Sequence, residues 1–157
     1  MRTSAEYLSD LKKMKKNVYV GGERVDRDDP RLQPTLRIIS TTFDLAQNPE
    51  YEGVVTATSS LTGKKINRFS YLHQNPYDLM QKQKMIRLLT QRVGGCILRC
   101  ISLDMIIALS ITTKEIDDKY GTEYNRRFLD YLKEYQEKDW SAAGAQTDMK
   151  GDRIKRP

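Results

Sequence analysis

Both cysteines of the 157-residue chain lie in one short segment, GGCILRCISLDMII, at residues 94–107. Apolar periodicity predicts a helix over residues 96–119, on which Cys96 and Cys100, four positions apart, would share one face. Two thiolates so placed can bind one soft metal centre, and the spacing suits two iron corners of an iron–sulfur cluster. Zinc usually takes a second ligand pair, whereas the chain has no third cysteine and only one histidine. Spacing alone favours the other interpretation, in which both cysteines are small packing residues of a buried helix.

A second segment that can do chemistry is TDMKGDR, at Thr147–Arg153, which combines one glycine, a Thr-Asp pair and two cations. Such a loop can offer backbone N–H groups and positive charge to a diphosphate, although a solvated turn has the same composition. The one histidine, His73, is expected in a loop, and we assign it no catalytic role. Arg99 stands between the two cysteines, and a helix would turn it to a different face.

Helices must position both segments, because apolar residues recur at helical spacing over most of the chain. The predicted helices span residues 4–15, 34–47, 76–92, 96–119 and 122–138. The stretch NVYVGGERV predicts a hairpin that turns at Gly21-Gly22, and residues 54–72 predict a second hairpin or an irregular loop. The expected fold class is therefore mainly α with small β hairpins.

Capping residues and apolar stripes give these helices their expected ends and buried faces. Ser4 is expected to cap the first helix, and Gly121 to end the fourth. The fourth helix is apolar almost all round between Ile101 and Ile111, which is typical of a buried helix. The predicted core positions of the other helices are Leu8, Leu11, Leu36, Ile39, Phe43, Ala46, Leu79, Met85, Ile86, Leu89, Phe128, Leu132 and Tyr135.

Charge and hydropathy patterning argue against several classes of partner. The net charge is +6, but basic residues are scattered among acids and form no recognition motif, so we expect no nucleic-acid partner. No apolar run approaches the about 20 residues of a membrane span. The first residues, MRTSAEYLSDLKKMKK, fit neither a signal peptide nor a transit peptide, so we expect a cytoplasmic protein with reduced thiols.

Four segments resemble the 4-hydroxyphenylacetate 3-hydroxylase family of flavoproteins. They are TGKKINRFSYLHQ, GGCILRC, TTKEIDDKYGTEYNRRFLDYLKEYQEKD and GAQTDMKGDR. The resemblance, from about Ser4 to Arg153, implies the N-terminal helical domain of an acyl-CoA-dehydrogenase-like flavoprotein at residues 1–145. Residues 146–157 would begin the linker into a middle β domain outside this chain. The resemblance thus implies a homotetrameric enzyme of which this chain, inactive alone, is one part.

The C-x₃-C pair resembles the dehydratase branch of the family. That likeness implies that Cys96 and Cys100 are two ligands of a 4Fe–4S cluster, whose other ligands, a histidine and a cysteine, come from further along the enzyme. Members of the branch dehydrate an acyl-CoA substrate, 4-hydroxybutyryl-CoA, to crotonyl-CoA by a flavin-radical mechanism, and they isomerise vinylacetyl-CoA. By position, the implied FAD contacts are Gln146, Thr147, Asp148, Met149, Lys150, Gly151, Asp152 and Arg153.

Two alternatives stay open beside the dehydratase. In the first, the chain is the N-terminal domain of a flavin-dependent aromatic hydroxylase of the same fold, and the cysteines only fill space. In the second, the chain is a helical domain without enzymatic chemistry that docks on another subunit.

Overall fold

The apolar periodicity of the chain becomes six α-helices and two small hairpins in the described part of the computed structural model, which covers residues 1–142, 144 and 151. The helices are α1 (Ser4–Lys13), α2 (Gln33–Gln47), α3 (Glu52–Val55), α4 (Pro76–Val93), α5 (Cys100–Tyr120) and α6 (Tyr124–Glu137). The strands are β1 (Val18–Val20), β2 (Glu23–Val25), β3 (Thr56–Thr58) and β4 (Lys65–Asn67). Three short 3₁₀ turns are η1 (Pro30–Leu32), η2 (Pro49–Tyr51) and η3 (Arg68–Ser70). The predicted fold class, mainly α with small hairpins, is confirmed. None of the helices in these residues is long and apolar enough to cross a membrane.

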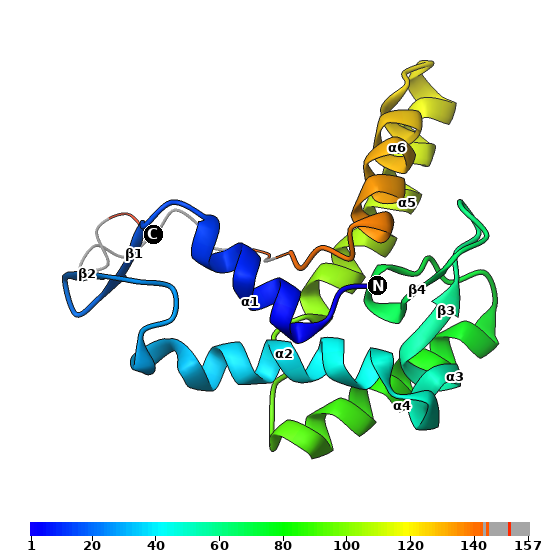
Figure 1. Ribbon diagram of the computed structural model, residues 1–157. Coiled ribbons are helices and arrows are strands. Elements are labelled where there is room, and N and C mark those ends of the chain that lie inside the picture. The colour runs from blue at the N-terminus through cyan, green and yellow to red at the C-terminus, as the bar shows by residue number, and fades with distance from the viewer. Residues whose placement is uncertain (143, 145–150, 152–157) are drawn as a thin grey trace.

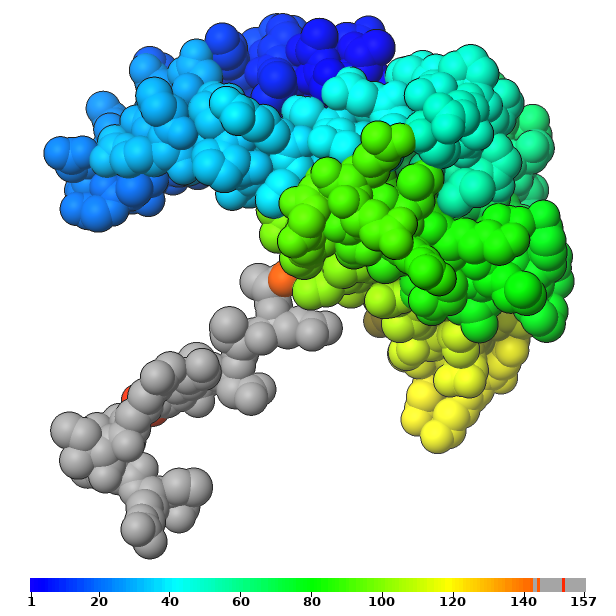
Figure 2. All heavy atoms as spheres, turned by 90° about the horizontal axis from the view of Figure 1, so that it is seen from below, coloured from blue at the N-terminus to red at the C-terminus, as the bar shows by residue number. Residues whose placement is uncertain are grey.

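The helices form a body from which one helical pair projects. α1 packs on α2, and α2 packs on α3 and α4. The first part of α5 lies within this body, and its remainder runs alongside α6 away from it (Figure 1). The space-filling view shows the far end of that pair as a protrusion (Figure 2). One long helix therefore has two quite different surroundings along its length.

Two turns show how local chemistry sets the elements. At the β1–β2 turn, where Val20 pairs with Glu23, Gly21 and Gly22 have φ values of 59° and 85°. A two-residue turn with both φ angles positive needs glycine-like residues, so the predicted hairpin is confirmed. The cap of α1 was expected at Ser4, but it is Thr3, whose Oγ1 accepts from the Glu6 N–H at 3.2 Å. The Glu6 carboxylate accepts in return from the Thr3 N–H at 2.8 Å, which completes a capping box.

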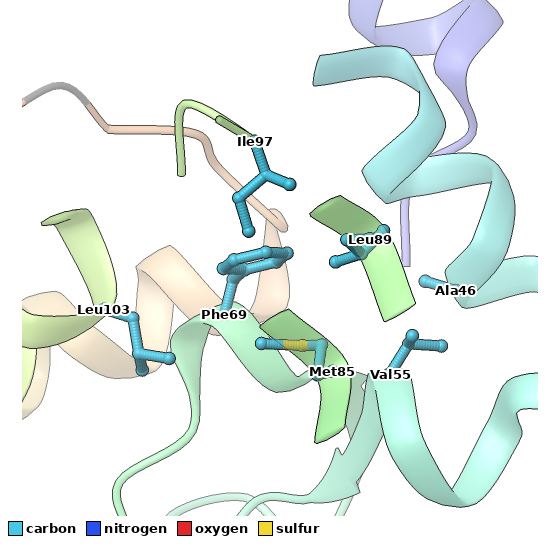
Figure 3. Packing of buried hydrophobic residues seen from close by; sticks show 7 residues of the cluster. All are labelled: Ala46, Val55, Phe69, Met85, Leu89, Ile97 and Leu103. Atoms are coloured by element: carbon cyan, nitrogen blue, oxygen red, sulfur yellow. The ribbon is translucent and has the colours of Figure 1, made fainter. Parts of the chain in front are cut away.

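The main core joins α2, α3, α4, η3 and the start of α5. Its buried members are Ala46, Val55, Phe69, Met85, Leu89, Ile97 and Leu103 (Figure 3). The Phe69 ring lies between Ile97 and Met85. Burying each large side chain of this kind stabilises the fold by about 1.5–3 kcal/mol. The core therefore holds the segment just before α5, as well as the helices.

A second cluster, Ile106, Phe128, Leu132 and Tyr135, joins α5 to α6. Two predictions about burial are wrong. Leu79 in the first turn of α4 is 48% exposed, whereas its neighbour Asp78 is the buried residue of that turn. The expectation that α5 is buried all round also fails, since Ile101 and Ile111 are 48% and 55% exposed. Among the described residues, α6 is the main element that packs along the outer part of α5, which leaves Ile111 largely exposed.

Candidate functional site

The two cysteines do not share a helix face as predicted. Gly94, at φ 73°, ends α4 in the left-handed conformation, and α5 begins only at Cys100. Residues 95–99 between the two helices form a loop, in which Leu98 has a φ of 60°. A left-handed residue cannot continue a right-handed helix, so Cys96 lies off the helix and Cys100 is its first residue. We call residues 95–100 the cysteine loop.

Side chains of the cysteine loop alternate between the interior and the surface. Cys96 and Leu98 are exposed, whereas Ile97 and Arg99 are 1% and 0% exposed. Cys100 is half-buried and packs against the main core. Both thiols are free. The loop is thus attached to the body by Ile97 and Arg99, while its first thiol faces outward.

Arg99 is the most unusual residue of the loop. Its guanidinium carbon lies 4.5 Å from the centre of the Phe43 ring and 4.8 Å from the centre of the Phe69 ring. Nη1 donates to Thr42 Oγ1 at 2.8 Å, and Nη2 donates to the Trp140 carbonyl at 3.2 Å. The guanidinium is therefore held between two aromatic rings from α2 and η3, with acceptors at its edge.

Asp139 supplies the opposite charge. It follows α6, is 1% exposed and has a φ of 46°, which is uncommon for a residue other than glycine. Its Oδ1 lies 3.6 Å from Arg99 Nη2, and its Oδ2 accepts from the backbone N–H of Arg2 at 3.1 Å. Burial lowers the pKa of Arg99 and raises the pKa of Asp139, and each charge opposes the shift of the other. A buried ion pair thus joins the cysteine loop to the chain that leaves α6.

His73 lies near the start of α5 but is separate from Ile97 and Arg99, the residues that attach the cysteine loop to the body. It stands in the loop before α4, with its ring centre 6.4 Å from that of Tyr71. Burial is the main cause of a lowered pKa for His73, and the nearby charge of Lys82 adds to that decrease. Within the described part of the chain, its Nε2 is buried without a hydrogen-bond partner, and we assign it no catalytic role.

The thiols fit one part of a metal centre. Across residues 1–142, 144 and 151, no group of three or more His, Cys, Asp or Glu side chains gathers around a common point. Two thiols are half of the ligands that a 4Fe–4S cluster usually takes. Cys96 is exposed and Cys100 half-buried, so the loop presents sulfur at the surface of this domain, where ligands from outside these residues can join it. The donor set therefore fits half of a shared cluster.

The predicted FAD segment cannot be placed. Of residues 146–153, only Gly151 belongs to the described part of the chain. The boundary expected after residue 145 falls in the same region and stays a prediction. The segment that leads toward it starts at Asp139 and Trp140, the partners of Arg99. An open groove of about 570 Å³ borders this segment, lined among others by Tyr7, Leu98 and Trp140.

Comparison with known sequences gives one family for nearly the whole chain. The family described as 4-hydroxyphenylacetate 3-hydroxylase N terminal matches residues 3–157. The chain is 44% identical, over 98% of its length, to the 4-hydroxybutyryl-CoA dehydratase/vinylacetyl-CoA-Δ-isomerase of Clostridium aminobutyricum. It is 26% identical, over 99% of its length, to the oxygenase component of 4-hydroxyphenylacetate 3-monooxygenase from Thermus thermophilus. The chain spans 32% of each of these two relatives.

Comparison with solved structures gives the same order of similarity. An oxygen-tolerant archaeal 4-hydroxybutyryl-CoA dehydratase from N. maritimus matches with a TM-score of 0.91 and 39% identity, over 99% of this chain and 31% of that one. An oxygenase component of 4-hydroxyphenylacetate 3-monooxygenase, solved with FAD and 4-hydroxyphenylacetate, matches with a TM-score of 0.72 and 19% identity. That match covers 100% of this chain and 32% of the oxygenase, and it speaks for the fold alone.

Proposed function

Since the chain belongs to the 4-hydroxyphenylacetate 3-hydroxylase family, we propose that it is the N-terminal helical domain of an enzyme that dehydrates 4-hydroxybutyryl-CoA to crotonyl-CoA and isomerises vinylacetyl-CoA. The observation that carries this proposal is that the chain is more similar to dehydratases than to oxygenase components of the same family. Identity is 44% to the clostridial dehydratase but 26% to the bacterial oxygenase component. The TM-scores of 0.91 and 0.72 favour the same branch.

The proposal includes two cofactors, a 4Fe–4S cluster and FAD. Cys96 and Cys100 would hold the cluster through their thiolates, since soft sulfur ligands suit iron–sulfur centres. Residues 146–153 would contribute to the FAD site, and the FAD-bound oxygenases of this fold support a flavin in the family. When bound, the flavin supplies one-electron redox chemistry, and the cluster supplies a Lewis acid for the leaving hydroxyl.

The chain's own contribution is to hold and shape rather than to move protons. Its two thiols form half of a cluster ligand set, and we assign none of the described residues the role of a base. The activity therefore belongs to the assembled enzyme, which we expect to be a cytoplasmic homotetramer, and the chain alone should be inactive. Measurable dehydration of 4-hydroxybutyryl-CoA by the pure chain, supplied with flavin and iron, would contradict this expectation.

The aromatic-hydroxylase alternative has weaker support, because at 19% identity the oxygenase likeness is one of fold only. The docking-domain alternative predicts no cofactor at all. Both alternatives leave Cys96 and Cys100 without a metal, and exposed Cys96 does not fill space in the core as the packing interpretation expected. One experiment on these two positions therefore separates both alternatives from the dehydratase.

The experiment measures iron, acid-labile sulfide and turnover in the anaerobically purified enzyme that contains this chain. We expect Cys96→Ala and Cys100→Ala each to lose iron and dehydration together, because a thiolate ligand is gone. Leu98→Ala is the matched control, since Leu98 lies exposed in the same loop without a donor atom. If both cysteine variants keep full iron and full turnover, the cluster assignment to these two residues fails. A natural enzyme that contains no iron or acid-labile sulfide and does not dehydrate 4-hydroxybutyryl-CoA would instead support the hydroxylase alternative.

A further inference from the structure

We propose that Arg99 is the positioning residue of the cysteine loop, and that its pairing with Asp139 fixes where Cys96 and Cys100 lie. The inference deepens the proposed function and rests on it only where the thiols are taken as cluster ligands. Its basis is the geometry of one guanidinium that lies between the two cysteines and contacts three separate parts of the chain.

The contacts of Arg99 define one orientation of its side chain. The rings of Phe43 and Phe69 approach the guanidinium at 4.5 and 4.8 Å, so it cannot tilt without losing contact with one of them. Hydrogen bonds to Thr42 and Trp140 fix its edge. The planar, forked guanidinium suits such a place, and the single ammonium of lysine does not.

The rest of the loop supplies little directional restraint. Gly94 precedes it and Gly95 begins it, and neither has a side chain that could anchor the chain. The Gly95 N–H donates to the Thr90 carbonyl at 3.1 Å, which ties the first residue of the loop to the end of α4 but does not reach the segment between the thiols. Leu98 is exposed and has the left-handed conformation, which is strained for a residue other than glycine and persists only where the surroundings enforce it. Ile97 is buried, but apolar contact is non-directional. Arg99 is therefore the group that can set the direction of the backbone between the thiols.

Stability alone does not explain a charged pair in this place. Both Arg99 and Asp139 are almost completely buried, and the Nη2–Oδ1 separation of 3.6 Å exceeds hydrogen-bond distance. Taking two charges out of water is costly, and replacing such a pair by neutral residues often leaves stability unchanged or raises it. A buried pair that adds little stability is best understood as a device for conformational specificity, here the geometry of the cysteine loop.

The pair also links two segments to which cofactors are assigned. Asp139 and Trp140 begin the stretch that leads to residues 146–153, the proposed FAD contacts. Arg99 binds both of these residues and stands next to Cys100. One anchor thus positions the cysteine loop and the chain just after α6 together, so a displacement of either is transmitted to the other.

The test measures thiol accessibility in the 157-residue chain without any metal. Iodoacetamide is added under native conditions, and the alkylation rates of Cys96 and Cys100 are followed separately by peptide mass spectrometry. In the natural sequence we expect exposed Cys96 to react about tenfold faster than half-buried Cys100, a factor equivalent to about 1.4 kcal/mol of local opening free energy.

The decisive variant is Arg99→Met combined with Asp139→Asn, which removes both charges and leaves neither unpaired. We expect it to stay folded by circular dichroism while the tenfold difference between the thiols collapses to about twofold or less, since a loosened loop exposes both. Arg99→Lys keeps the charge but loses the fork, and we expect an intermediate ratio. A folded double variant with the natural ratio would overturn the proposal.

Arg68→Met is the matched control. Arg68 is also buried, and it donates to the carbonyls of Val54 and Thr56, both at 2.7 Å, rather than to any residue of the cysteine loop. We expect this variant to lose stability without changing the ratio of the two alkylation rates. If Arg68→Met changes the ratio as much as the double variant does, general loosening explains the effect and the positioning role is wrong.

The two proposals fail in different ways. Alkylation of the metal-free chain reports the loop geometry whether or not the cysteines hold a cluster. If Cys96→Ala and Cys100→Ala leave iron unchanged in the enzyme, the proposed function fails while the accessibility result stands. If the enzyme needs both cysteines but the double variant keeps the natural ratio, only the positioning role fails.

Discussion

The two ends of α5 are held in place by different kinds of contact. At the Cys100 end, Ser102 and Leu103 are buried, Leu103 in the main core, and a buried ion pair lies beside them. At the Tyr120 end, Leu109 and Ile111 are 46% and 55% exposed, and α6 is the main element that packs against the helix. The first end is fixed by residues far away in the sequence, and the second by its own neighbours.

The polar contacts show the same difference. At the far end, Asp117 caps the start of α6: its carboxylate accepts from the N–H groups of Tyr124 and Asn125 at 2.9 and 2.8 Å, and from Thr122 Oγ1 at 2.6 Å. All three donors lie within eight residues of the acceptor. The Cys100 end of α5 therefore has a fixed geometry. The Tyr120 end forms a local pair of antiparallel helices with α6, and part of its apolar surface stays uncovered.

The strongest test of the difference between the two ends of α5 is a cavity made at the end that lies in the body. We expect Leu103→Ala to lower the free energy of unfolding by about 2–5 kcal/mol, because Leu103 is fully buried. Leu109→Ala, on the exposed side of the same helix, should change it by about 0.5 kcal/mol or less. Urea denaturation of both variants measures the difference. Equal losses would mean that the two ends are not distinct.

A smaller effect is expected from the cap at the far end. Asp117→Ala removes the acceptor for two backbone N–H groups of α6, so it should lower the melting temperature slightly and speed hydrogen exchange at the start of α6. Asp117→Asn keeps an acceptor oxygen, so its melting temperature and exchange rates should lie between those of the natural chain and those of Asp117→Ala. Amide exchange in the body should not change. If the body loosens as much as α6, the hairpin is not a local unit.

His73 gives the body end a weak dependence on pH. Its pKa is lowered from 6.5, chiefly by burial and then by Lys82, with Asp78 and Asp104 acting against the decrease and Arg68 adding to it. Between the lowered pKa and 6.5 the unfolded chain binds more protons than the folded one, so stability falls as the pH decreases through that window. Above about pH 6.5 this contribution is fully present. Unfolding measured from pH 7.5 to 5 should show the slope, and His73→Gln should remove it.

The smallest change in stability is expected where charge is added to the far end. Leu109→Lys and Ile111→Lys should leave the unfolding free energy nearly unchanged, since both side chains are exposed. They should, however, reduce self-association of the isolated chain, because exposed apolar patches drive it. Light scattering at high protein concentration measures this. A natural chain that is already monodisperse and monomeric there would contradict the expectation.

Local signals in the sequence were enough to predict most elements. The Gly21-Gly22 pair supplied the turn, and helical periodicity found α2, α4 and α6 to within a few residues. The start of α5 was predicted four residues too early. Leucine is a good helix former, so nothing in its type indicates that Leu98 takes a φ of 60°. Periodicity also counts apolar residues without saying which of them find a partner, which is why α5 was expected to be buried all round.

The role of Arg99 in holding the cysteine loop could not be predicted from the neighbouring residues in the sequence. Arg99 meets Thr42 across 57 positions and Trp140 across 41, and a charged residue is usually expected at the surface. The cysteines themselves were found from type and spacing, but their placement on one helix face was wrong. Their role as cluster ligands, and that of residues 146–153 toward FAD, came from family resemblance and stays a prediction.

The long reach of Asp139 has a consequence for how the protein is made. On the ribosome, Cys96 and Cys100 emerge before Asp139 and Trp140, the residues that bind Arg99. The carboxylate that accepts the Arg2 N–H is 137 positions further along the chain than Arg2 itself. Closing such distant contacts costs chain entropy, so they form late. The nascent chain therefore carries two unanchored thiols and an unpaired arginine until the segment after α6 has been synthesised. The native geometry of the cysteine loop is therefore reached only after most of the domain has been synthesised, and anything that reacts with the two thiols earlier meets them before they are in place.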